Sequence, residues 1–135
     1  MKTRALPAAL AAAGLVAALS GCTLANAITP PVEAQLYPTA ADGQASNASI
    51  PIPSWVPDDA TMIRIKENSE TGATIMQFTT GAAVLGGACE PGATDAAPAL
   101  QDTWWPQTLP PVENINCQDG WKIFGAGNGM FDAWK

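Results

Sequence analysis

The sequence predicts a small, mainly β domain built from two β-hairpins, or an α+β domain if one short helix forms. Three observations support this prediction. Two pairs of β-prone segments each flank a polar turn that contains glycine, which is the pattern of a β-hairpin. No long segment after residue 49 has the apolar spacing of an amphipathic helix. Two cysteines, Cys89 and Cys117, are available to brace the sheet with one disulfide.

The domain is predicted to span residues 50–135, and a hairpin is expected near its start. Three prolines in residues 50–57 favour an extended lead-in, whose tryptophan and valine pack on the domain. Residues 57–60 suit one tight turn. In residues 61–66, isoleucines alternate with basic residues, as in a half-buried strand. A polar turn ending in glycine separates them from a second β-prone run at 73–80.

The middle of the domain is predicted to be irregular. The glycine-rich residues 81–87 fit either a short strand or a loop. Residues 90–102 are expected to form a loop, with one short helical turn at 95–100. Residues 103–111 contain three prolines and are expected to be extended again.

The C-terminal residues give the clearest secondary-structure signal. Segments 120–125 and 130–134 flank a short connection; in a strand, Trp121 and Ile123 would share one face, as would Phe131 and Ala133. Asn128 and Gly129 in that connection readily supply the positive φ angles of a tight two-residue turn. A second hairpin is therefore predicted here, with at least one buried face.

Residues 1–21 have the composition of a secretory signal peptide. Lys2 and Arg4 give a positive start, and residues 5–19 are uncharged and mostly apolar. A signal peptide cut elsewhere, for example after Ala25 or Ala27, and an uncleaved transmembrane anchor are the alternatives. The abundance of alanine and glycine and the early proline argue against the membrane-spanning alternative.

The run Leu19-Ser20-Gly21-Cys22 that ends this segment resembles the lipobox of bacterial lipoproteins. In that family, processing enzymes attach a diacylglyceryl group to the cysteine thiol and cleave the chain before this cysteine. The resemblance implies cleavage between Gly21 and Cys22, and lipidation of Cys22. It places the protein at the cell membrane, facing the extracytoplasmic side, since two acyl chains anchor a protein stably.

Residues 22–49 are predicted to form a disordered tether between the membrane and the domain. The segment is rich in proline, alanine and serine, and few of its side chains besides Leu36 and Tyr37 could fill a core. A flexible coil of this length would hold the domain on the order of 30 Å from the membrane.

The charge of the chain excludes two classes of ligand. Two of the six basic residues leave with the signal peptide, so four remain against twelve acidic residues and the net charge falls from −6 to −8. Such a surface repels nucleic acid and anionic lipid headgroups. We expect neither as a ligand.

The cysteines favour a disulfide over a metal site. With Cys22 assigned to lipid, Cys89 and Cys117 remain, and in an oxidising compartment they are expected to pair. A zinc site is not expected, because the chain has no histidine and two thiolates do not complete a tetrahedral shell. No spaced array of oxygen ligands predicts calcium, and no cofactor motif is present.

The residue types present argue against catalysis. Without histidine, the usual general base and most nucleophile triads are absent. An enzyme would have to rely on carboxylates alone, as in a cell-wall hydrolase. That would require two aspartates to converge on one substrate, from the following five: Asp58, Asp59, Asp102, Asp119 and Asp132.

Five tryptophans in the domain are the one unusual feature that points to a ligand. Trp104 and Trp105 are neighbours on an extended segment and face opposite ways, so one of them could be exposed. An exposed indole can stack on a sugar ring or anchor a protein interface. The alternative, which is the more frequent outcome, is that all five tryptophans fill a small core.

The lipobox, the proline-rich tether, the segment at 54–61 and the closing Asp-Gly-Trp at 119–121 together resemble small lipoproteins of the actinobacterial cell envelope. The resemblance implies membrane anchoring and brings no activity with it. We therefore predict a non-catalytic binding or accessory module, whose partner is an envelope protein or a glycan. A carboxylate-dependent hydrolase and a passive structural subunit are the alternatives.

Overall fold

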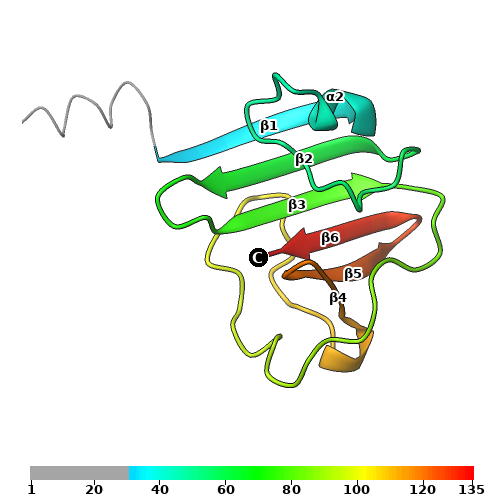
Figure 1. Ribbon diagram of the computed structural model, residues 1–135. Helices are drawn as coiled ribbons and strands as arrows, with labels where there is room; N and C mark the ends of the chain where they lie inside the picture. The colour runs from blue at the N-terminus through cyan, green and yellow to red at the C-terminus, as the bar shows by residue number, and fades with distance from the viewer. Residues whose placement is uncertain (1–30) are drawn as a thin grey trace, which may run out of the picture.

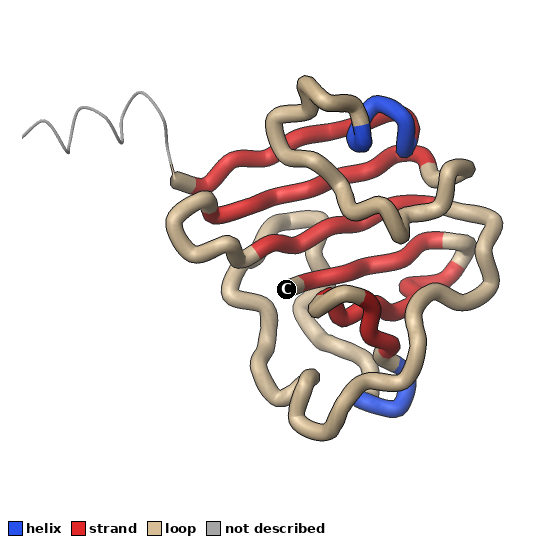
Figure 2. Tube along the Cα trace, in the orientation of Figure 1, coloured by secondary structure: helices blue, strands red, loops and turns tan. Residues whose placement is uncertain are grey.

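The computed structural model describes residues 31–135 as a single six-stranded antiparallel sheet with irregular segments packed on it (Figures 1 and 2). The strands lie side by side in the order β1-β2-β3-β6-β5-β4. Their bounds are β1 (Val32–Thr39), β2 (Thr61–Asn68), β3 (Thr74–Thr79), β4 (Asn116–Gln118), β5 (Trp121–Gly127) and β6 (Met130–Trp134). The helical segments described are α2 (Ala40–Gln44) and the 3₁₀ turn η1 (Val112–Asn114). The mainly β prediction is confirmed.

Both predicted hairpins are present, as β2–β3 and β5–β6. In the second hairpin, Asn128 has φ 55° and Gly129 has φ 75°, as a tight two-residue turn requires. The two hairpins join through the pairing of β3 with β6, where Phe78 lies opposite Phe131 and their rings stack 6.0 Å apart. The predicted turn at 57–60 is confirmed by a hydrogen bond from the Ala60 amide to the Pro57 carbonyl.

The prediction of a disordered tether over residues 22–49 is wrong from residue 32 onward, because these residues form β1 and α2. β1 pairs with β2 along almost its whole length. The Tyr37 hydroxyl donates to the Ile50 carbonyl at 3.1 Å and accepts from the Ile50 amide at 3.2 Å, which ties the strand to the following loop. Thr39 and Asp42 form a capping box at the start of α2. The folded domain thus begins near residue 32 rather than residue 50.

One face of the sheet, which we call the Phe78 face, is covered by residues 45–60. Its buried side chains come from five strands and include Tyr37, Ile63, Ile65, Met76, Phe78, Trp121, Ile123 and Phe131. Ile50, Ile52 and Val56 of the covering segment close this core. Trp55 lies between Phe78 and Trp121, with ring centroids 6.2 Å and 5.8 Å away. The lead-in therefore packs as predicted.

The opposite face, which we call the Trp134 face, is covered by the irregular segment 89–115. Its core contains Ile75, Trp105, Ile115, Phe124 and Trp134. Residues 81–87 form a loop that makes one bridge to β4, between Gly87 and Cys117. The predicted helical turn at 95–100 is wrong, since these residues form bends and irregular coil. Pro98 restricts the residue before it to extended geometry, which opposes a helix there.

The predicted disulfide is confirmed. Cys89 and Cys117 are bonded, with their Cα atoms 4.9 Å apart. The bond fastens the covering segment to β4, which is a short strand at the edge of the sheet. Only part of the Trp134 face is covered by this segment, and the part formed by β1 and β2 bears exposed side chains.

The predicted signal peptide, lipobox and lipidated Cys22 lie outside the described residues. Within residues 31–135, no helix has the length and apolar character needed to cross a bilayer.

Candidate functional site

The neighbouring tryptophans have different environments. Trp105 is only 3 % exposed and packs edge-on against Phe124, with ring centroids 6.1 Å apart. Trp104 is only half-buried, and its ring lies 6.0 Å from that of Trp105 at an angle of 80°. Trp105 thus belongs to the core, whereas part of the Trp104 indole is open to solvent. The prediction that the two side chains face opposite ways on an extended segment is wrong, because residues 103–105 form a turn and the two rings contact each other edge to face.

The backbone that carries Trp104 is fixed to the sheet by three contacts. Lys66 of β2 donates from Nζ to the Gln101 carbonyl at 2.9 Å and to Asp102 Oδ2 at 3.0 Å. Gln77 of β3 donates from Nε2 to the Trp104 carbonyl at 3.4 Å. The buried ring of Trp105 holds the other side of the turn. A side chain presented on such a fixed turn loses little conformational entropy on binding.

Trp104 lines a hollow of about 380 Å³ on the uncovered part of the Trp134 face. We call this hollow the Trp104 groove, and its lining residues are Ala34, Gln35, Leu36, Arg64, Ile65 and Trp104. β1 and β2 form the floor, because Leu36 lies opposite Arg64 in their antiparallel register. The Leu36 side chain is 66 % exposed, so an apolar surface is present beside the indole.

The groove is a positive region on an acidic protein. Its lining contains Arg64 and no acidic residue. Arg64 is exposed and forms no ion pair within residues 31–135. Its register neighbours on β1 and β3 are Leu36 and Gln77, which are both neutral. Lys66, in contrast, is neutralised by Asp102. The Arg64 guanidinium is therefore available to an external anion.

A buried carboxylate lies in the same region, under the covering segment. Asp132 of β6 is 1 % exposed and accepts a hydrogen bond on Oδ1 from Gln77 Nε2 at 2.9 Å. Burial raises the pKa of Asp132 to about 6, since the charged form is poorly solvated there; the Gln77 hydrogen bond opposes this rise. Asp132 does not line the Trp104 groove.

This carboxylate gives the domain an unusual expected pH dependence. The folded state binds the Asp132 proton more tightly than an unfolded chain does, and this difference adds to the free energy of unfolding. The added stability is fully present below an ordinary aspartate pKa of about 4 and is lost as the pH rises through about 6. We expect the free energy of unfolding to increase as the pH is lowered from about 7 to about 5. Urea denaturation across this range should show the increase, and Asp132→Asn should abolish it. An unchanged slope in the variant would assign the effect to another group.

The carboxylates considered for a hydrolase have separate contacts and surroundings. Asp59 accepts from the Thr80 hydroxyl at 2.6 Å and from the Gly81 amide at 2.8 Å, and these bonds lower its pKa. The hydrogen bond from Lys66 lowers the pKa of Asp102. Asp58 and Asp119 are exposed, the latter in the turn between β4 and β5. No group of three or more potential metal ligands occurs within the part of the chain that the structure describes.

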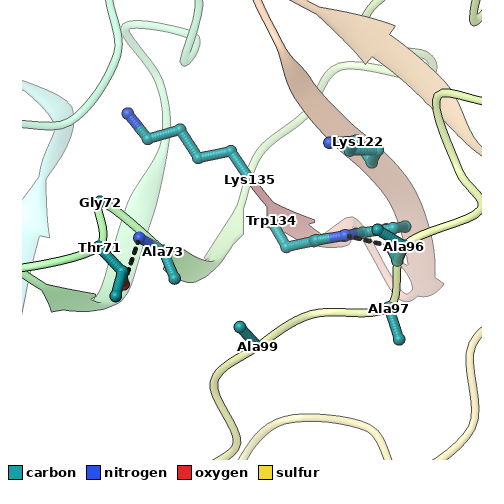
Figure 3. Close-up of a pocket in the computed structure, with 9 residues that line it drawn as sticks. All are labelled: Thr71, Gly72, Ala73, Ala96, Ala97, Ala99, Lys122, Trp134 and Lys135. Atoms are coloured by element: carbon teal, nitrogen blue, oxygen red, sulfur yellow. Dashed lines mark hydrogen bonds between the residues drawn. The ribbon is translucent and has the colours of Figure 1, made fainter.

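A larger hollow of about 490 Å³ lies beside the end of β6 (Figure 3). Trp134 contributes to its wall but is buried, and its ring nitrogen donates to the Ala96 carbonyl at 3.4 Å. Two lysines line it, but the Lys135 ammonium lies 5.3 Å from the centre of the Trp121 ring. In Figure 3 the Lys135 side chain extends away from Lys122, so the two cations do not converge.

The sequence identified Trp104 as a candidate contact but missed the surface beside it. Leu36 was assigned to the tether, although residues 32–37 contain an alternation that is typical of a strand. Arg64 lies on the face opposite the isoleucines of β2, as the alternation predicts, but the sequence assigns no function to it.

No protein-family model, curated protein or solved structure matches this chain.

Proposed function

We propose that this protein is a membrane-anchored extracytoplasmic lipoprotein whose domain is a non-catalytic binding module, with the Trp104 groove as its contact surface. The carrying observation is that Trp104 is only partly buried on a turn fixed to two strands, while Trp105 beside it is buried. A large aromatic side chain held in a defined position beside an exposed apolar residue is typical of a recognition site.

The arrangement of the carboxylates supports binding rather than hydrolysis. Asp59 and Asp102 are each engaged in local contacts, and Asp132 is buried away from solvent. A hydrolase of the predicted kind needs two carboxyl groups facing one substrate. The Trp104 groove has none in its lining. A passive spacer would also lack such a pair, but it would not need an indole fixed at the surface.

The anchoring part of the proposal rests on the resemblance of residues 19–22 to a lipobox. The structure shortens the linker that this anchor implies, because β1 begins at Val32. A flexible coil of about ten residues has an average end-to-end distance of about 17 Å, compared with on the order of 30 Å for the longer tether. The domain, with its groove on β1 and β2, would therefore act close to the outer surface of the membrane.

Mass spectrometry of the protein from its native membrane is expected to find a diacylglyceryl group on an N-terminal Cys22. Cys22→Ser should release the protein from the membrane fraction, because the thiol that carries the lipid is gone. Cys89→Ser/Cys117→Ser serves as the matched control and should stay in the membrane fraction. An unmodified N-terminus at Asn26 or at residue 28 would contradict the anchoring proposal.

Site-specific photo-cross-linking in cells tests the binding proposal. A photoreactive residue at position 36, in the groove, should yield one reproducible adduct that Trp104→Ala abolishes. Position 112 is the matched control, because Val112 is 65 % exposed and lies outside the groove. If both positions give the same products, or if Trp104→Ala leaves the adduct unchanged, the groove is not the contact surface.

A further inference from the structure

We infer that the Trp104 groove binds a saccharide that carries a carboxylate, with the sugar ring against the Trp104 indole and the carboxylate on the Arg64 guanidinium. The inference rests on the proposed binding function and adds the chemical class of the ligand. Three features of the groove lead to it: an available arginine, a fixed aromatic surface and an open, shallow shape.

Arg64 sets the charge of the ligand. A guanidinium presents parallel N–H donors that match the two oxygens of a carboxylate. Arg64 is exposed, has no ion pair within the described residues, and lies between neutral register neighbours. The nearby Lys66 cannot compete for the ligand, because Asp102 already binds it at 3.0 Å. The groove therefore offers one unpaired cation, the Arg64 guanidinium, to one carboxylate of the ligand.

Trp104 sets the shape of the ligand. An indole offers a large apolar surface with a polar edge, which suits the C–H face of a sugar ring. Its position is fixed before binding by the contacts of Lys66 and Gln77 to the turn. Ala34 contributes only a methyl group to the strand floor, which leaves room for a ring lying flat on it.

The openness of the groove favours a sugar over a protein side chain. Protein hot spots are usually closed, fully desolvated pockets into which one large side chain inserts. The Trp104 groove is instead a shallow surface formed by two strands and one half-exposed indole. A ring with hydroxyl groups on its outer edge can lie there and keep those hydroxyls in water.

The charge of the rest of the protein limits how acidic the ligand can be. With a net charge of −6 over the whole sequence, the protein repels long polyanions. A saccharide with one carboxylate among neutral sugars avoids most of that repulsion. The hollow in Figure 3 also contains cations and no acidic residue, but its Trp134 is buried and its Lys135 is engaged by Trp121.

The test is a calorimetric titration of the full-length protein, solubilised in detergent, with two matched disaccharides. The acidic probe is glucuronosyl-glucose, and the neutral probe is cellobiose, which has the same ring framework without the carboxylate. We expect the acidic probe to bind at least tenfold more tightly, and Trp104→Ala to abolish binding of both. Arg64→Gln should reduce the acidic preference to about twofold or less, and Arg64→Lys should give an intermediate value, because it keeps the charge without the paired donors.

Each other outcome has a defined meaning. Equal affinity for both disaccharides would overturn the carboxylate assignment and leave the binding function standing. No binding of either probe would overturn the saccharide inference, while the cross-linking at position 36 decides the binding function separately. Competition by acetate as strong as that by the acidic disaccharide would reduce the groove to a simple anion site and overturn the inference. Val112→Ser should bind like the unaltered protein, and the melting temperatures of all variants establish that they are folded.

Discussion

Replacing Trp105 with alanine is expected to lower the free energy of unfolding by about 3–5 kcal/mol, whereas the same change at Trp104 costs about 1 kcal/mol. Trp105 is 3 % exposed and fills the core of the Trp134 face against Phe124. Its loss leaves a cavity that the irregular covering segment cannot close without moving the turn. Trp104 is only partly buried, so its removal opens a smaller cavity.

Urea denaturation of the two single variants measures this difference. Trp105→Phe is the matched control, because it keeps an aromatic ring in the core and should recover part of the loss. Trp105→Ala should also weaken ligand binding through the displaced turn, whereas Trp104→Ala should do so in a protein of nearly normal stability. Equal destabilisation by both alanine variants would contradict the assignment of one residue to the core and one to the surface.

Loss of the disulfide is the second large expected effect. Cys89 and Cys117 are separated by 28 positions in sequence, and closing a loop of about this length removes about 3.6 kcal/mol of chain entropy from the unfolded state. For a domain of this size, that corresponds to a decrease in melting temperature of about 15 °C. The bond holds the covering segment on β4, so the core around Trp105 should loosen first.

Calorimetry of Cys89→Ala/Cys117→Ala, compared with the oxidised and chemically reduced forms of the unaltered chain, measures this contribution. The reduced form and the double variant should melt at similar temperatures, both well below the oxidised form. A double variant that melts within about 3 °C of the oxidised protein would show that packing alone holds the covering segment in place.

The sequence predicts the hairpins because their signals are local. Alternating isoleucines in β2 and the Asn128-Gly129 turn each specify strand geometry within a few residues. The sequence does not reveal β1 as a core strand because its alternation places the apolar residues on the outer side: Tyr37 is its one buried side chain, while Leu36 faces solvent. An edge strand with a single buried residue resembles a polar linker until its partner strand is known.

The groove was predictable only in part. Trp104 and Trp105 lie in a turn, in which the Trp105 amide donates to the Asp102 carbonyl, and not on the extended segment that the prolines predict. Which of the two is buried depends on Phe124, which is distant in sequence. Arg64 acquires its role from neighbours supplied by β1 and β3, and no local pattern reveals that they are neutral. The buried position of Asp132 depends likewise on the covering segment lying over β6.

The most direct test of the Trp104 groove uses the indole N–H resonances of the full-length protein, labelled with ¹⁵N on tryptophan. Addition of purified cell-wall fragments is expected to shift the Trp104 signal and to leave Trp55 unchanged, because Trp55 packs on the Phe78 face between Phe78 and Trp121. The buried Trp105 and Trp134 should shift little. A shift at Trp55 with none at Trp104, or no shift at any tryptophan while the fragments are bound, would contradict the account.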